Sequence, residues 1–281
     1  MLMSHSPAYK HLLTLIGARS QQWLRFQIEQ FPTEARLDHD HLDDLAEIAV
    51  AAYICTGLRG TAAPVETFLR GHFTPDFVGI FLSSLGRGRA RTSRGTAMFR
   101  ILTPEDRAGI ELWQPLSLAD RLALSDRLDA PLLAEAQAFL KAPVPEEQLT
   151  EGVIDTYARV LALCYRFGAE RPRFADSRTY GDAYANCLRF ADWAQRKGRL
   201  TPLAQLCFCL RLIDPDHDVS PMLADIVASQ RPDGSFPVQV GFGTGDQDRE
   251  ALAPTLAALV AVHMAVYRQW RRPQPTLPLA A

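Results

Sequence analysis

The spacing of apolar side chains predicts a protein built almost entirely of α-helices. Apolar residues recur about every 3.6 positions over 8–29 and again over 38–57, where acidic residues open the helix and Gly57 ends it. The same period predicts further helices over 64–70, 75–85, 104–113, 117–128, 129–140, 147–167, 180–197, 201–212, 219–230 and 249–270. Only 236–241 has the character of a short extended piece, and β and α units do not alternate, so we expect the all-α class.

Breaks in this pattern predict how the chain is divided. The prolines of 141–145 interrupt the helices, so we expect an N-terminal helical region over 1–141, a second region over 146–272 and a tail over 273–281. Two turns in the second region are alike: each has a Gln, a basic residue and a glycine, followed by a helix of small apolar residues. This faint repeat favours an array of helical hairpins.

The second of these turns carries the most specific motif in the chain. Residues 230–236 read Gln-Arg-Pro-Asp-Gly-Ser-Phe, where Asp-Gly after proline predicts a tight turn. The motif resembles the Gln-x-x-Asp-Gly-Ser-Trp/Phe repeat of the terpene cyclase and protein prenyltransferase superfamily. That resemblance implies an α/α toroid, in which an inner and an outer ring of helices surround a deep apolar cavity. Residues 1–141 would then be diverged helices of the ring or a separate helical subdomain.

The chain departs from that superfamily at the residues that would carry its chemistry. The Asp-x-Asp-Asp proton donor of class II cyclases has its nearest counterpart in Asp214, Asp216 and Asp218, which lack the adjacent pair of acids. No pattern matches the Asp, Cys and His zinc ligands of the prenyltransferases. We therefore predict no metal and no cofactor, with Mg²⁺ on the oxygens of these aspartates as the alternative.

Composition narrows the function classes. The chain has 281 residues, 47% of them hydrophobic, and a net charge of -2, which favours an ordinary globular core and disfavours nucleic acid as a partner. No apolar run approaches the roughly 20 residues of a membrane span. Residues 1–10 lack a signal-peptide pattern, and the five cysteines are typical of buried reduced thiols, so we predict a cytoplasmic location. The pattern predicts no particular oligomeric state.

Candidate catalytic carboxylates lie in the 214–218 turn and in the loop that opens the last long helix. In the implied toroid this loop rims the cavity, so Asp246 and Asp248, together with Asp216, are placed to move a proton. Crowded carboxylates hold a proton because like charges raise the pKa of one partner. A surface loop and a capped turn are the alternative interpretations.

Candidate substrate-binding residues are three arginines and one histidine. Arg87, Arg89 and Arg91 lie on a glycine-rich segment and can clamp phosphate or diphosphate through paired N–H donors. They can also contact RNA, although no aromatic residues are interleaved for base stacking. His263, in an apolar helix, is either a general base facing a cavity or a hydrogen-bonded core residue.

These observations favour an enzyme of small-molecule biosynthesis. Its substrate would be hydrophobic, and the resemblance implies an isoprenoid-like molecule. Carboxylate acid–base chemistry would cyclise or isomerise it. The alternative is a non-catalytic protein that binds a partner through a toroid groove. An enzyme predicts an apolar pocket with two or more ionisable groups facing inward, whereas a partner protein predicts a shallow exposed apolar patch.

Overall fold

The protein is all-helical over the residues that the structure describes. The computed structural model describes residues 6–30, 39–60, 117–125, 128–241 and 250–267. Its α-helices are α1 (Pro7–Glu29), α2 (His39–Leu58), α7 (Leu118–Leu124), α8 (Ala130–Lys141), α9 (Glu151–Cys164), α10 (Arg178–Arg196), α11 (Leu200–Ile213), α12 (Ser220–Ala228) and α13 (Leu252–Tyr267). The predicted extended piece contributes a single bridge, between Arg199 and Gln239. The all-α prediction is confirmed.

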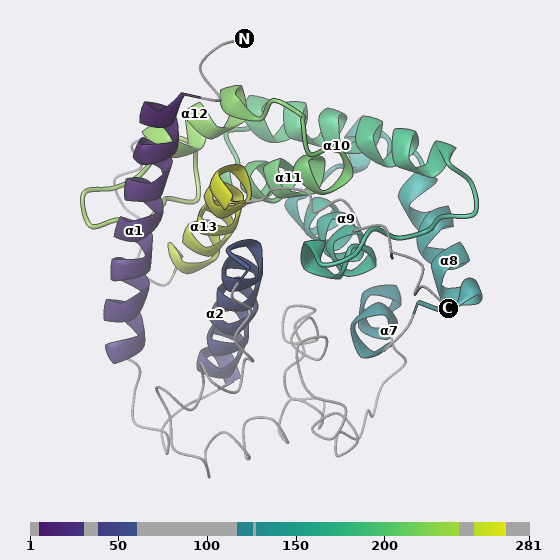
Figure 1. Ribbon diagram of the computed structural model, residues 1–281, viewed down its shortest axis with the longest axis horizontal. Helices are drawn as coiled ribbons and strands as arrows, with labels where there is room; N and C mark the ends of the chain where they lie inside the picture. The colour runs from purple at the N-terminus through teal and green to yellow at the C-terminus, as the bar shows by residue number, and fades with distance from the viewer. Residues whose placement is uncertain (1–5, 31–38, 61–116, 126–127, 242–249, 268–281) are drawn as a thin grey trace, which may run out of the picture.

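The helices form two curved layers (Figure 1). In the inner layer α2 packs against α13, α13 against α11, α11 against α9 and α9 against α7. In the outer layer α1 packs against α13, α12 against α11, and α10 against both α11 and α8. From α7 to α13 consecutive helices alternate between the layers, so each outer helix connects two neighbouring inner helices.

Side-chain caps mark the starts of two helices, and one predicted helix ends earlier than expected. Ser117 forms a capping box at the start of α7, and the Thr150 hydroxyl accepts a hydrogen bond from Val153 N–H at the start of α9. The helix predicted over 147–167 ends early, at Cys164. Arg166 and Phe167 then take positive φ angles of 48° and 55°, which a right-handed α-helix does not permit. This bend carries the Phe167 ring into the interior.

The motif at 230–236 forms a corner that contacts α1. The Gln230 amide Nε2 donates hydrogen bonds to the carbonyl oxygen of Ile16 (3.0 Å), to the hydroxyl of Ser20 (3.0 Å) and to the carbonyl oxygen of Gly234 (3.2 Å). The Ser20 hydroxyl also donates to the Gly234 carbonyl (3.0 Å). Gly234 has a φ of +99°, which its missing side chain permits. The corner thus fastens the N-terminal helix to the C-terminal part of the chain.

The rest of the corner is anchored on both sides. The Arg19 guanidinium of α1 donates to the carbonyl oxygen of Pro232 at 2.6 Å. Phe236 is completely buried, and its backbone N–H donates to the Thr255 hydroxyl of α13 at 2.9 Å. Because these contacts come from α1 and α13, the corner links an outer helix to an inner one.

In the part of the chain that the structure describes, one hydrophobic core joins the two regions predicted from the sequence. Buried side chains of α1 and α2 belong to the same cluster as those of α9, α11 and α13. The predicted division lies where α8 ends at Lys141, and it stays a prediction. All five cysteines are free and buried. None of the described helices combines the length and the apolar character needed to cross a membrane.

Candidate functional site

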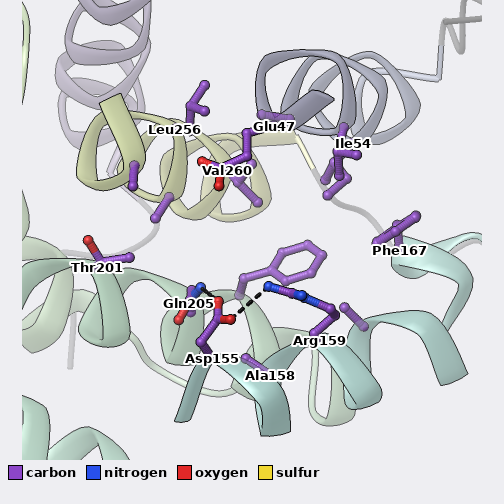
Figure 2. Close-up of a pocket in the computed structure, with 16 residues that line it drawn as sticks. Glu47, Ile54, Asp155, Ala158, Arg159, Phe167, Thr201, Gln205, Leu256 and Val260 are labelled. Carbon is purple, nitrogen blue, oxygen red and sulfur yellow. Dashed lines mark hydrogen bonds and ion pairs between the residues drawn. The ribbon is translucent and has the colours of Figure 1, made fainter. Parts of the chain in front are cut away.

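A pocket of about 170 Å³ lies between four inner helices (Figure 2). Each helix lines it with residues spaced along one face, at positions i, i+3, i+4 and i+7 or part of that series. On α2 these are Glu47, Val50, Ala51 and Ile54, on α9 Asp155, Ala158, Arg159 and Ala162, on α11 Thr201, Gln205 and Phe208, and on α13 Ala253, Leu256, Ala257 and Val260. The Phe167 ring completes the lining. The walls are therefore mostly apolar.

The four helices cross Figure 2 in the same direction. The labelled residues advance from left to right along each: Glu47 to Ile54 on α2, Asp155 to Arg159 on α9, Thr201 to Gln205 on α11 and Leu256 to Val260 on α13. Since α10 and α12 connect α9, α11 and α13 through the outer layer, each connection returns the chain to the same end of the pocket.

A polar cluster occupies the α9–α11 wall. The Arg159 guanidinium donates to Oδ2 of Asp155 at 2.7 Å, and the Gln205 Nε2 donates to Oδ1 of the same carboxylate at 2.8 Å. The Arg159 side chain is only 9% exposed and that of Asp155 23% exposed. Charges in such a place need close partners, because leaving water costs several kcal/mol per ion. Asp155 and Arg159 therefore balance each other's charge in the wall of the pocket.

The amide of Gln205 is oriented by its hydrogen bond to Asp155. Because Nε2 donates to Asp155, Oε1 is left as an acceptor, and it is buried without a hydrogen-bond partner among the described residues. An unsatisfied buried acceptor costs roughly 1–3 kcal/mol. Glu47 supplies a carboxylate from α2, on the opposite wall (Figure 2). The arrangement can hold the apolar part of a molecule. It can also accept a hydrogen bond from a polar group on that molecule and exchange a proton with it.

His263 lies deep between α1, α2 and α13 and does not line this pocket. Its Nδ1–H donates to the Leu259 carbonyl (2.9 Å), and its Nε2 accepts from the Arg59 guanidinium (2.6 Å) and lies 3.3 Å from Nε2 of Gln21. Burial, with a further contribution from Arg59, lowers the pKa of His263 to about 4. These bonds fit the core-residue alternative, and a role in substrate binding stays a prediction.

We expect His263 to make the protein less stable in mild acid. In the unfolded chain its pKa returns to about 6.5, so the unfolded state binds more protons than the folded state between pH 6.5 and 4. The contribution, about 3 kcal/mol, is complete above pH 6.5 and is lost as the pH falls to 4. Urea unfolding across this range should show a flatter profile for His263→Gln. Replacing the exposed His11 should leave the wild-type slope, and an unchanged slope in His263→Gln would refute this assignment.

The 214–218 turn connects α11 to α12 and is held by hydrogen bonds from backbone N–H groups to two of its aspartates. Oδ1 of Asp214 accepts the N–H of Asp216 (3.0 Å), and Oδ1 of Asp218 accepts the N–H of Ser220 (3.0 Å). The Asp216 side chain is exposed and does not line the pocket. The described residues contain no cluster of three or more His, Cys, Asp or Glu side chains suited to a metal ion.

The remaining candidates, Asp246, Asp248, Arg87, Arg89 and Arg91, lie outside the described residues and stay predictions. The polar residues of the pocket were not among the residues predicted from the sequence. Asp155 and Arg159 have the i, i+4 spacing of an ordinary surface pair. The available signal was the neighbourhood: both share their helix face with Ala158 and Ala162 rather than with polar side chains.

The pocket between α2, α9, α11 and α13 is therefore the candidate site. Comparison of the chain with protein-family models, with curated proteins and with solved structures finds no match. The function is accordingly inferred from the chemistry of the pocket and the arrangement of the helices around it.

Proposed function

We propose that the protein is an enzyme that binds a small hydrophobic molecule carrying a hydroxyl or N–H group and moves a proton on it. The observation that carries the proposal is the Gln205 side chain, which lines an apolar pocket and is oriented by Asp155, and whose Oε1 is buried without a hydrogen-bond partner among the described residues. A ligand donor would satisfy it, and a ligand that lacks the donor would leave it unpaired. Such sites discriminate strongly between the two.

The volume of the pocket limits the group that enters it. An apolar cavity of roughly 150 Å³ holds one benzene molecule. The present pocket, at about 170 Å³, therefore suits one ring or a short branched chain. A larger substrate would place only its reacting end here. This size agrees with a single isoprenoid-like unit.

The two carboxylates of the pocket suit different roles. Both oxygens of Asp155 already accept hydrogen bonds, from Arg159 and Gln205, so Asp155 positions these side chains. Glu47 faces them from α2 and is the better candidate for proton transfer to or from the ligand. Apolar walls exclude water and strengthen the electrostatic interactions inside. An isomerisation or cyclisation needs only such proton movements. Asp246, Asp248 and Asp216 stay candidates for a further acid.

We further propose that the helices form an α/α toroid. Three observations support it: outer and inner helices alternate, the inner helices around the pocket run in one direction, and α13 packs beside α1 and α2. The corner at 230–236, with its resemblance to the terpene cyclase and prenyltransferase repeat, fastens α1 to this end of the chain. The pocket would then occupy the inner face of the ring.

Benzyl alcohol and toluene test the proposal, because they have the same ring and differ in one hydroxyl group. We expect benzyl alcohol to bind about tenfold or more tightly than toluene in saturation-transfer NMR, since it satisfies Gln205 Oε1. Gln205→Met should remove this preference. Ala257→Phe fills the pocket and should abolish binding of both, whereas Ala265→Phe, on the same helix outside the lining, should not.

Equal binding of the two probes to the wild-type protein, or a preference that survives Gln205→Met, would contradict the proposed donor group. Binding that survives Ala257→Phe would place the ligand elsewhere. Circular dichroism of each variant separates these outcomes from unfolding. If the pocket binds neither probe, the alternative of a non-catalytic protein that binds a partner explains the function better.

A further inference from the structure

A second pocket, of about 310 Å³, lies between α1, α2 and α13. Ala51 and Leu256 line both pockets, so the second one is on the other side of the contact between α2 and α13. We propose that it is a separate binding site for an amphipathic anion, an apolar chain that ends in a carboxylate or a phosphate. This inference goes beyond the proposed function and does not depend on it.

The floor of the second pocket is apolar. It is formed by aliphatic side chains of all three helices, among them Leu24 and Ile28 of α1, Ile48 of α2 and Leu259 of α13. On α1 the lining residues follow the i, i+3, i+4, i+7 series from Gln21, which places them on one face of the helix. A chain of several methylene groups would gain roughly 0.8 kcal/mol for each one it buries there.

The charges in the lining are positive. Arg25 and Arg59 contribute to the pocket, and no Asp or Glu is among the described residues that line it. Arg25 has no hydrogen bond or ion pair within the described part of the chain. Its guanidinium can therefore give its donors to a ligand without breaking a contact with the described residues. An anion fits this site better than a neutral or cationic headgroup.

Contacts hold the Arg59 side chain in place and leave several of its N–H donors available. One terminal nitrogen donates to Nε2 of His263 at 2.6 Å, and the guanidinium carbon lies 5.0 Å from the centroid of the Tyr267 ring. A guanidinium has five N–H donors, so several remain. Because its position is already fixed, less side-chain entropy is lost when a ligand binds. Arg25 and Arg59 together form a headgroup site beside an apolar pocket.

Eight-carbon probes with different headgroups test the inference by calorimetry at low ionic strength. We expect octanoate or octyl phosphate to bind at least tenfold more tightly than 1-octanol, and the tighter of the two anions identifies the headgroup. Arg25→Met should weaken anion binding about tenfold, and Arg25→Lys should retain most of it. Lys10→Met removes the same charge from an exposed position of α1 and should leave the affinity unchanged.

Two pocket-filling variants separate this site from the first one. Ala52 lines only the second pocket and Ala257 only the first, so Ala52→Phe should abolish octanoate binding and Ala257→Phe should preserve it. The inference is overturned if 1-octanol binds as tightly as both anions, if Arg25→Met matches the wild type, or if anion binding survives Ala52→Phe in a folded protein. None of these results affects the benzyl alcohol test.

Discussion

Gly234→Ala is expected to destabilise the protein by about 4 kcal/mol. The φ of +99° at this corner strains any residue with a side chain. In addition, a Cβ atom at Gly234 would lie 2.5 Å from the carbonyl oxygen of Arg19, which belongs to the backbone of α1 and cannot rotate away. The corner or α1 must then shift. Urea unfolding measures the cost, and fluorescence of Trp23, buried on α1, reports whether that helix loosens.

Gly241→Ala is the matched control for this prediction. Gly241 has nearly the same φ, +104°, but a Cβ atom there meets nothing within 4 Å. It should therefore show the backbone strain alone, roughly 1–2 kcal/mol. Equal losses for the two variants would mean that the approach of α1 to the corner contributes nothing to stability.

Asp155→Leu is expected to cost a similar amount, about 4 kcal/mol. The change removes the carboxylate that Arg159 and Gln205 both contact, and it leaves a guanidinium that is only 9% exposed beside apolar walls. Breaking one side of a buried pair costs more than the pair itself contributes, because the remaining charge stays out of water and the opposite charge of the pair is gone. Chemical denaturation of the single variant gives the free energy of unfolding directly.

The double variant Asp155→Leu/Arg159→Met should recover most of this loss, because no charge of the pair then remains in the pocket. Asp192→Leu is the exposed counterpart, since Asp192 pairs with Arg196 at the same i, i+4 spacing while both side chains are at least half exposed. It should cost less than about 1 kcal/mol. A double variant as unstable as Asp155→Leu would show that Arg159 is not the source of the penalty.

The helices were predictable because periodic apolar residues determine them locally. Residues 8–29 and 180–197 were expected as helices, and α1 and α10 span Pro7–Glu29 and Arg178–Arg196. The end of α9 was not predictable, because the positive φ angles of Arg166 and Phe167 carry no signal in the types of residue. The Asp-Gly corner was recognised as a tight turn. Its contacts with Ile16 and Ser20, more than 200 residues away, depend on the tertiary fold.

The pocket could not be predicted because its chemistry comes from four helices at once. A single polar residue on an apolar face, such as Gln205, gives no sign of what faces it across a cavity. The acids chosen as candidates form clusters in the sequence, and in the 214–218 turn two of them accept hydrogen bonds from backbone N–H groups two residues further along the chain. Residues that are close in the sequence therefore need not meet at one site, because neighbouring inner helices in this fold are separated in the sequence by an outer helix.

A crystal structure of the protein with benzyl alcohol tests the central claim most directly. We predict a ring in contact with Leu256 and Val260, and a hydroxyl oxygen about 2.7–3.0 Å from Oε1 of Gln205. An unoccupied pocket at saturating benzyl alcohol, or side chains that close the space between α2 and α9, would contradict the account.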